Sequence, residues 1–249
     1  MGGNVSYAGY VRTMVLNDDI DYDLAVICYG QNDDDEQFSM YYESIIRALH
    51  SKYEKCSIIS ILESAQKGYT TKMKEIQNIA DYYEIPVADT IEPFKDDYDN
   101  LTYDDVHPND EGHKLYAECI EKIIDKQVTV NTGFPDYDRV PINDSVTAFT
   151  NCDYIGVDQF EKDDLTYIIH IEKSGIFGID YSYVSGENKA QIYIDGELFS
   201  APTVTFYYDF SQRHILIVSD DCTVDKEIKI IFGNEEQAAG FYGVCFSYK

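Results

Sequence analysis

The part of the chain that decides the fold is residues 24–33, which read LAVICYGQND. The run begins with apolar residues, as is typical of a strand buried on both faces of a parallel sheet. The polar turn Gly30-Gln31-Asn32-Asp33 follows directly, and loops at the carboxyl ends of parallel strands are where α/β proteins place their functional groups. We therefore expect a parallel sheet that presents Asn32 at its carboxyl edge. Taken alone, the turn is explained better by a purely structural role than by a functional one.

Helical and strand-like patterns alternate around this segment. Apolar residues recur at helical spacing in residues 4–16, 36–52 and 67–83, and short apolar runs predict strands at residues 57–62 and 85–89. A last amphipathic helix begins at Asn109 or Asp110, since both are favoured N-cap residues. Such alternation indicates a parallel α/β sheet, and we expect residues 1–128 to form this domain.

Beyond about residue 128 the apolar pattern changes from helical spacing to alternation along strands. Strand-like runs occur at residues 167–171, 191–194, 204–208, 214–218 and 228–232. The pair Asp195-Gly196 is typical of a two-residue hairpin turn. We therefore expect residues 129–249 to form a separate antiparallel β-sandwich, jelly-roll-like in organisation.

A second polar motif, Asp104-Asp105-Val106-His107-Pro108-Asn109, lies just before the last predicted helix. An aspartate three residues ahead of a histidine can accept the imidazole Nδ1–H. This contact fixes the tautomer and leaves Nε2 to act as a base, as a Ser-His-Asp unit requires. A helix-capping turn with an exposed histidine would explain the same pattern.

Together, in this order and setting, the two motifs resemble those of the SGNH hydrolases, the GDSL-like lipases and acylhydrolases, over residues 3–127. Asn32 matches the family asparagine, His107 the histidine and Asp104 the aspartate, and residues 106–113, VHPNDEGH, resemble a family stretch. Gly3, at the start of the first predicted helix, best fits the family glycine. Asp105 stands where many members have glycine.

The resemblance implies a flavodoxin-like, three-layer α/β domain and a serine esterase mechanism that needs no metal or organic cofactor. His107 would act as general base and then acid, oriented by Asp104, while Asn32 and Gly3 would donate hydrogen bonds to the oxyanion. The expected substrate is a small acyl ester. An acetylated glycan is favoured because many family members with an appended β-sandwich act on polysaccharides.

The family nucleophile is missing, because no Gly-Asp-Ser motif follows an apolar strand in this sequence. The family order places a strand, the serine turn, a helix and a second strand ahead of the glycine. We therefore expect an α/β domain without its first strand, and a chain that is inactive by itself. It is a truncated product, or another polypeptide supplies the strand and the serine, or it is a non-catalytic remnant.

Two other functions stay open. One is a non-catalytic glycan- or partner-binding protein with a vestigial hydrolase domain. The other, weaker possibility is a metal site, formed by Asp104, His107 and His113 or by the acidic clusters at residues 33–36 and 96–99. Neither cluster has the spacing of a calcium-binding loop.

The composition excludes several classes of partner. Lys+Arg number 19 against 46 Asp+Glu, a formal net charge of −27, which repels phosphate backbones and anionic lipid. The six cysteines include no Cys-x-x-Cys pair, so neither a zinc site nor a disulfide framework is indicated. No apolar run is long enough to span a bilayer. We expect neither a nucleic-acid nor a membrane partner.

Overall fold

The computed structural model describes residues 4–15, 20–33, 36–63, 68–104, 106–130, 140–143 and 151–248, with the side chains of residues 127–130 left aside. Contacts divide the chain into two units, Leu16–Val146 and the combination of Met1–Val15 with Thr147–Lys249. This division differs from the boundary expected between residues 128 and 129, because the first helix belongs with the β-rich unit.

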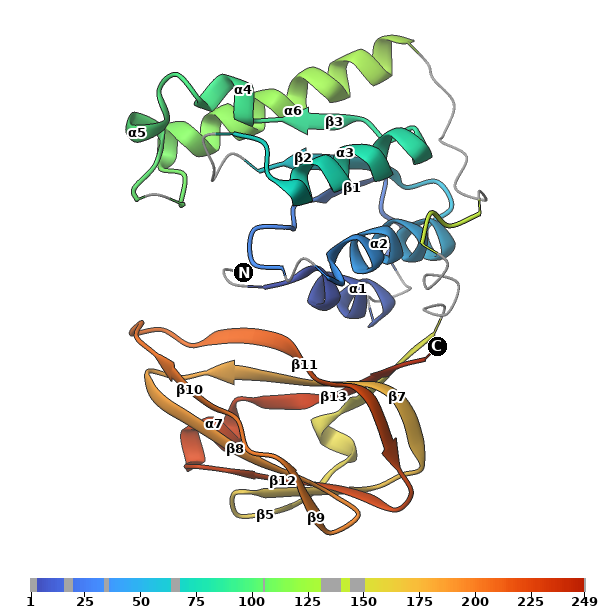
Figure 1. Cartoon of the computed structure of the whole chain (residues 1–249), viewed down its shortest axis with the longest axis vertical. Coiled ribbons are helices and arrows are strands. Elements are labelled where there is room, and N and C mark those ends of the chain that lie inside the picture. The colour runs from blue at the N-terminus through green and yellow to red at the C-terminus, as the bar shows by residue number, and fades with distance from the viewer. Residues whose placement is uncertain are drawn as a thin grey trace. The chain divides into compact units, whose positions relative to one another are not determined.

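The first unit is built on a parallel sheet in the order β1-β2-β3 (Figure 1). Its strands are β1 (Leu24–Ile27), β2 (Ser57–Leu62) and β3 (Val87–Asp89). Ala25 pairs with Ile58, and Ile61 pairs with Ala88. The expected parallel α/β sheet is therefore confirmed, and the carboxyl ends of all three strands lie at one edge.

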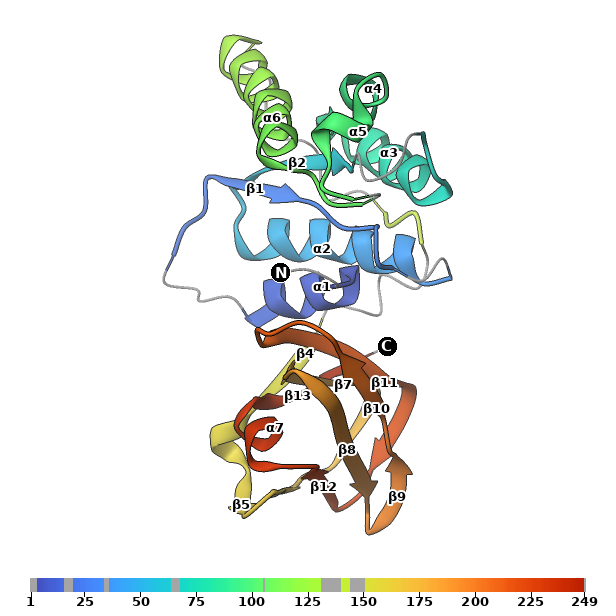
Figure 2. The same cartoon turned by 90° about the vertical axis from the view of Figure 1, so that its left-hand side faces the viewer.

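Helices cover both faces of this sheet (Figures 1 and 2). The unit contains α2 (Phe38–Lys52), α3 (Thr71–Tyr83), α4 (Ile91–Phe94), α5 (Tyr98–Leu101) and α6 (Asp110–Val130). On one face, Tyr116 and Ile120 of α6 pack against Ile59 and Ile61 of β2. On the opposite face lie α2 and α3. The result is the expected three-layer arrangement. Helix α6 begins at Asp110, where the sequence predicted the last helix to start.

The strand β1 forms one edge of this sheet. Among the described strands it pairs only with β2, and two of its apolar side chains are exposed, Leu24 at 39% and Val26 at 42%. Exposed apolar side chains on an open edge strand favour pairing with a further strand. An edge with these exposed residues is compatible with the expected further strand, which stays a prediction.

The second unit is an antiparallel sandwich of two sheets. One sheet has the order β10-β8-β12-β6-β5, with β9 paired to β8, and the other has the order β11-β7-β13-β4. The strands are β4 (Cys152–Gly156), β5 (Glu161–Asp163), β6 (Thr166–His170), β7 (Lys173–Tyr183), β8 (Gly186–Ile194), β9 (Glu197–Ser200), β10 (Thr203–Phe206), β11 (Gln212–Val224), β12 (Glu227–Phe232) and β13 (Phe241–Ser247), with the short helices η2 (Val157–Gln159) and α7 (Glu235–Ala239). Side chains alternate along β12, so Ile228, Ile230 and Phe232 enter the core shared by both sheets.

The hairpin between β8 and β9 forms where the sequence predicted it. Asp195 has a φ of 53° and Gly196 a φ of 87°, and a two-residue turn with both φ values positive matches the twist of the paired strands. Asp195 also accepts hydrogen bonds from the backbone N–H groups of Asp225, Lys226 and Glu227. The turn is thereby joined to the strand beside it.

Helix α1 (Ser6–Val15) packs on the sheet that contains β11 and β4. The Tyr7 hydroxyl lies 3.4 Å from Cys245 Sγ and 3.5 Å from Ser247 Oγ of β13. A Cβ on Gly178 of β7 would lie 2.7 Å from the same sulfur and 3.0 Å from the Tyr7 hydroxyl. The tyrosine therefore packs directly against the sheet, at a place that only glycine leaves open.

Candidate active site

The contact expected between Asp104 and His107 is present. The Asp104 Oδ2 atom lies 2.8 Å from His107 Nδ1, while Oδ1 accepts the backbone N–H groups of Val106 and His107, each at 2.7 Å. The His107 side chain is 65% exposed. Since Nδ1 is engaged, Nε2 is left as the nitrogen that can exchange a proton with a ligand.

The turn that carries this pair is held at both ends. His107 O accepts the N–H of Tyr103 at 2.8 Å, and Asn109 Oδ1 accepts the N–H of Gly112 at 3.1 Å, which makes Asn109 the N-cap of α6. A Cβ on Gly112 would lie 2.3 Å from Leu101 O, so this glycine allows the helix start to pack against the preceding segment. The histidine therefore projects from a defined turn.

Hydrogen bonding keeps Asp104 ionised. The backbone N–H of His107 contributes most, followed by its side chain and then by the N–H of Val106, and together they lower the pKa of Asp104 to about 2. A carboxylate at this position orients the imidazole and stabilises its protonated form. Asp104 can do so throughout the neutral and mildly acidic range.

The loop after β1 is held in an equally defined way. Gly30 has a φ of 124°, a conformation that favours glycine, and its N–H donates to Asp33 Oδ2 at 3.1 Å. Lys72 Nζ of α3 donates to Asp33 O at 2.7 Å. Asn32 lies between these anchored residues and is exposed. Asn32 therefore lies exposed in the loop at the carboxyl end of β1, and its role at the oxyanion stays a prediction.

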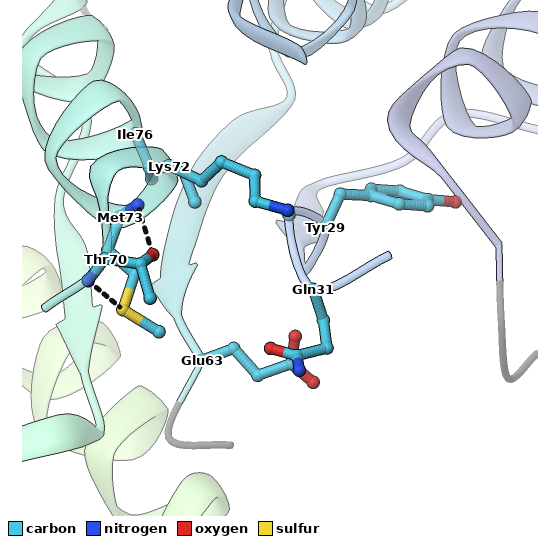
Figure 3. Close-up of a pocket in the computed structure, with 8 residues that line it drawn as sticks. Tyr29, Gln31, Glu63, Thr70, Lys72, Met73 and Ile76 are labelled. Atoms are coloured by element: carbon cyan, nitrogen blue, oxygen red, sulfur yellow. Dashed lines mark hydrogen bonds between the residues drawn. The ribbon is translucent and has the colours of Figure 1, made fainter. Parts of the chain in front are cut away.

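A pocket opens beside this loop (Figure 3). Its lining residues are Tyr29, Gly30, Gln31, Glu63, Thr70, Lys72, Met73 and Ile76. Burial raises the pKa of Glu63, and the charge of His107 opposes this rise. Glu63 is therefore a partly desolvated carboxyl in the pocket beside the loop that carries Asn32.

The sequence analysis overlooked Glu63. It directly follows the apolar run of β2, just as the Gly30 turn follows that of β1, so the rule that identified Asn32 could have found it. The convergence of Asn32 and His107 in one crevice stays a prediction. It is supported by the position of Asn32 after β1, at the carboxyl edge of the parallel sheet, and by the defined turn that presents His107.

The other candidate residues lie elsewhere. Gly3 is outside the described residues. Ser6, the serine nearest the start of the chain, is fully buried in α1. Within the described ranges, no group of three or more His, Cys, Asp and Glu side chains is placed to hold a metal ion, and the His113 ring packs beside Tyr116. In the same ranges, no helix is both long and apolar enough to cross a membrane.

Comparison with known proteins gives one family and a set of similar folds. Residues 2–115 match the model of the GDSL-like lipase/acylhydrolase family. None of the curated proteins matches the chain. Two crystal structures of a two-domain esterase active on acetylated mannans, one of them co-crystallised with mannopentaose, are each 18% identical and cover 100% of this chain and 79% of their own, with TM-scores of 0.73 and 0.72. An acetyl xylan esterase, 21% identical, covers 50% of this chain and 78% of its own, with a TM-score of 0.43.

At these identities the likeness to the two-domain esterase concerns the fold. It extends over both parts of the chain, the α/β layers and the mostly antiparallel β region. The fold class expected from the sequence is thereby confirmed.

Proposed function

Residues 2–115 match the model of the GDSL-like lipase/acylhydrolase family, and from this premise we propose that the chain provides the histidine and oxyanion-binding groups of a serine esterase. The observation that carries the proposal is the 2.8 Å contact between Asp104 and His107 Nδ1, because it leaves Nε2 for proton transfer. A two-domain esterase of the same fold is active on acetylated mannans. An acetylated glycan is therefore the first substrate to test.

In the proposed reaction His107 Nε2 takes the proton from a serine hydroxyl as the oxygen attacks the ester carbonyl. The Asp104 carboxylate holds Nδ1–H and stabilises the imidazolium that forms. The Asn32 amide donates a hydrogen bond to the oxyanion. His107 then returns the proton to the departing alcohol, and water releases the acyl group by the same steps in reverse.

The proposed reaction needs a nucleophilic serine, and the 249 residues contain no Gly-Asp-Ser motif to provide it. We infer that it belongs to a strand that pairs with the open edge of β1, whether on the same polypeptide or on another. Exposed Leu24 and Val26 on that edge support the inference, because a further strand would cover them. The serine would then follow its strand at the carboxyl edge that also carries Asn32.

An assay with p-nitrophenyl acetate tests the proposal. The 249-residue chain should show background hydrolysis that His107→Ala does not change, because removing a triad nucleophile costs on the order of a million-fold in subtilisin. When a family strand with its Gly-Asp-Ser turn is fused ahead of residue 1, hydrolysis should appear, His107→Ala should abolish it, and His113→Ala should leave it intact. Acetylated mannan or xylan should then be deacetylated.

Two results would contradict the proposal. Hydrolysis by the 249-residue chain alone, lost in His107→Ala, would show that it holds its own nucleophile. Ser6 would then be the first serine to replace. A fused protein that folds, yet hydrolyses no ester, would favour the non-catalytic binding function instead.

A further inference from the structure

Tyr103 lies directly opposite His107 in the turn that joins α5 to α6 (Figure 1). Thr102 and Pro108 form an antiparallel bridge, and the N–H of Tyr103 donates to His107 O at 2.8 Å. Opposite residues of an antiparallel pair place their side chains on the same side, with Cβ atoms about 5 Å apart. The Tyr103 ring and the His107 imidazole therefore share one face of the turn.

The side chain of Tyr103 is exposed and yet held in place. The residue is 71% exposed, and its hydroxyl donates to Asp110 Oδ1 at 3.2 Å, at the start of α6. This bond raises the pKa of the Tyr103 hydroxyl, so the phenol keeps its proton for the carboxylate. Both ends of the side chain are attached to the turn, while much of the ring is left to solvent.

The turn beneath the ring is formed before any ligand arrives. Asp104 Oδ1 accepts the N–H of His107 at 2.7 Å. The N–H of Asn109 donates to Leu101 O at 2.9 Å, and its side-chain amide donates to Asn100 O at 2.8 Å. A ligand that contacts the ring thus meets a surface placed in advance beside the imidazole, and a preformed site loses little entropy when it binds.

The proposed reaction brings the alcohol part of the substrate to this face. His107 Nε2 returns a proton to the departing alcohol, and a proton donor lies within about 3 Å of the oxygen that it protonates. The carbon atoms attached to that oxygen are therefore within contact range of the groups beside the imidazole. Across the turn, that neighbour is the ring of Tyr103.

The chemistry around the ring favours a neutral sugar as this alcohol. Asp104 follows Tyr103 in sequence and Asp110 binds its hydroxyl, so two carboxylates border the ring and disfavour an anionic alcohol. A pyranose offers an apolar C–H face to an aromatic ring and hydroxyl groups that can donate to carboxylates. A short alkyl alcohol could use the ring alone.

We propose that Tyr103 stacks on the sugar ring that carries the ester and is thereby a specificity-determining residue for sugar esters. The proposal rests on the function proposed above. Tyr103 exchanges no proton in that reaction and contacts the alcohol part rather than the ester carbonyl. Its replacement should therefore weaken the binding of sugars and leave the hydrolysis of small esters unchanged.

Binding to the 249-residue chain tests this without any hydrolysis. The chain has five histidines, and 13C-labelled histidine rings report by NMR on the turn through His107 and on the β-rich unit through His170 and His214. Titration with methyl β-mannoside should shift the His107 signal and leave those of His170 and His214 unchanged. Ethanol, which offers a hydroxyl group without a sugar ring, should give no saturable shift.

Three variants locate the contact. Tyr103→Ala should weaken the binding of the mannoside about tenfold, because the aromatic surface is lost. Tyr103→Phe keeps the ring and loses the bond to Asp110, so its affinity should stay within about threefold of that of the natural chain. Tyr207→Ala removes a tyrosine that is 87% exposed in the β-rich unit and should bind as the natural chain does. Unchanged His50 and His214 signals would show that Tyr103→Ala is folded.

The restored enzyme separates recognition from catalysis. With a Gly-Asp-Ser strand fused ahead of residue 1, Tyr103→Ala should raise the KM for an acetylated methyl mannoside about tenfold and leave kcat within about twofold. Its kcat/KM for ethyl acetate, whose alcohol has no ring, should equal that of the natural sequence. Damage to the histidine turn would instead lower kcat for both esters.

A His107 signal that does not respond to the mannoside, or that responds equally in Tyr103→Ala, would overturn the inference. A response at His170 alone would place the sugar on the β-rich unit and overturn it as well. Sugar binding at His107 in a fused protein without esterase activity would contradict only the proposed function. An active enzyme whose KM for the acetylated mannoside is unchanged by Tyr103→Ala would contradict only the role of Tyr103.

Discussion

At the scale of single residues, the ionisation of the Asp104 carboxyl decides whether His107 is oriented for proton transfer. Its carboxyl receives two backbone N–H groups and the imidazole Nδ1, and all three contacts favour the ionised form. Both side chains of the contact are largely exposed, Asp104 at 55% and His107 at 65%. Its value is therefore in orientation, because an exposed ion pair adds little to stability.

We predict that Asp104 titrates well below an ordinary aspartate. Its pKa in the folded chain is about 2 against an ordinary 3.8, so the contact is fully present above about pH 4 and is lost as the pH falls through 2. Carboxyl 13C NMR in an acid titration measures this directly. The variant His107→Ala should raise the midpoint only part of the way, because the backbone N–H of residue 107 is the largest cause and remains. A midpoint at or above 3.8 would refute the geometry of the turn.

At the scale of secondary-structure elements, a buried carboxyl joins two helices and a distant segment. Glu43 of α2 is fully buried. It accepts the Tyr83 hydroxyl of α3 at 2.5 Å, the N–H of Ile142 at 2.7 Å, and the N–H and side-chain amide of Asn143 at 3.0 and 2.9 Å. Residues 140–143 are thereby fastened to the α/β unit, beyond the boundary expected at residue 128.

We predict that Glu43→Gln destabilises the α/β unit by about 1.5–3 kcal/mol, because an amide cannot accept all four hydrogen bonds and a buried donor is left unpaired. Urea unfolding followed by circular dichroism measures the loss. The exposed counterpart Glu92→Gln should change the free energy of unfolding by no more than about 0.5 kcal/mol. If both variants unfolded at the same urea concentration, the contacts of Glu43 would not stabilise the unit.

At the scale of the whole molecule, the first helix and the sandwich form one contact unit although most of the chain separates them. Tyr7 and Cys245 are 238 residues apart in sequence, and both are buried. Asn4 adds a hydrogen bond to the backbone carbonyl of Arg213 at 3.3 Å. The β-rich part is therefore more than an appended module, because it carries a segment of the family-matched region, residues 2–115.

We predict that a peptide of residues 1–15 binds a fragment of residues 147–249 and raises its melting temperature, because α1 covers apolar surface of the sheet. The same peptide with Tyr7→Ala should raise it much less, since a large buried aromatic side chain contributes about 3–5 kcal/mol. Calorimetric melting of the fragment with each peptide measures the difference. Identical melting curves with and without the natural peptide would show that the sandwich does not need α1.

The local part of this architecture was predictable from sequence. The Asp104–His107 pair spans three residues, so the geometry of a single turn brings the two side chains together whatever the rest of the chain does. The hairpin at Asp195-Gly196 follows from two residues that tolerate positive φ. Apolar runs and helical spacing located β1, β2 and α6, because burial on a sheet face or helix stripe imposes a period on the sequence itself.

Three features were decided by the tertiary structure alone. They are the grouping of α1 with the sandwich, the four hydrogen bonds to Glu43, and the pocket that Gly30, Glu63 and Lys72 line from three separate segments. The Glu43 contacts join residues 40 to 100 positions apart and the α1 contacts more than 200. Contacts between residues so far apart leave no repeating pattern in the sequence around either partner, so neither set could be predicted from it. The sequence by itself therefore determined the local features, the Asp104–His107 turn, the hairpin and the main strands and helices of the α/β sheet, and only the packing of distant segments determined what surrounds them.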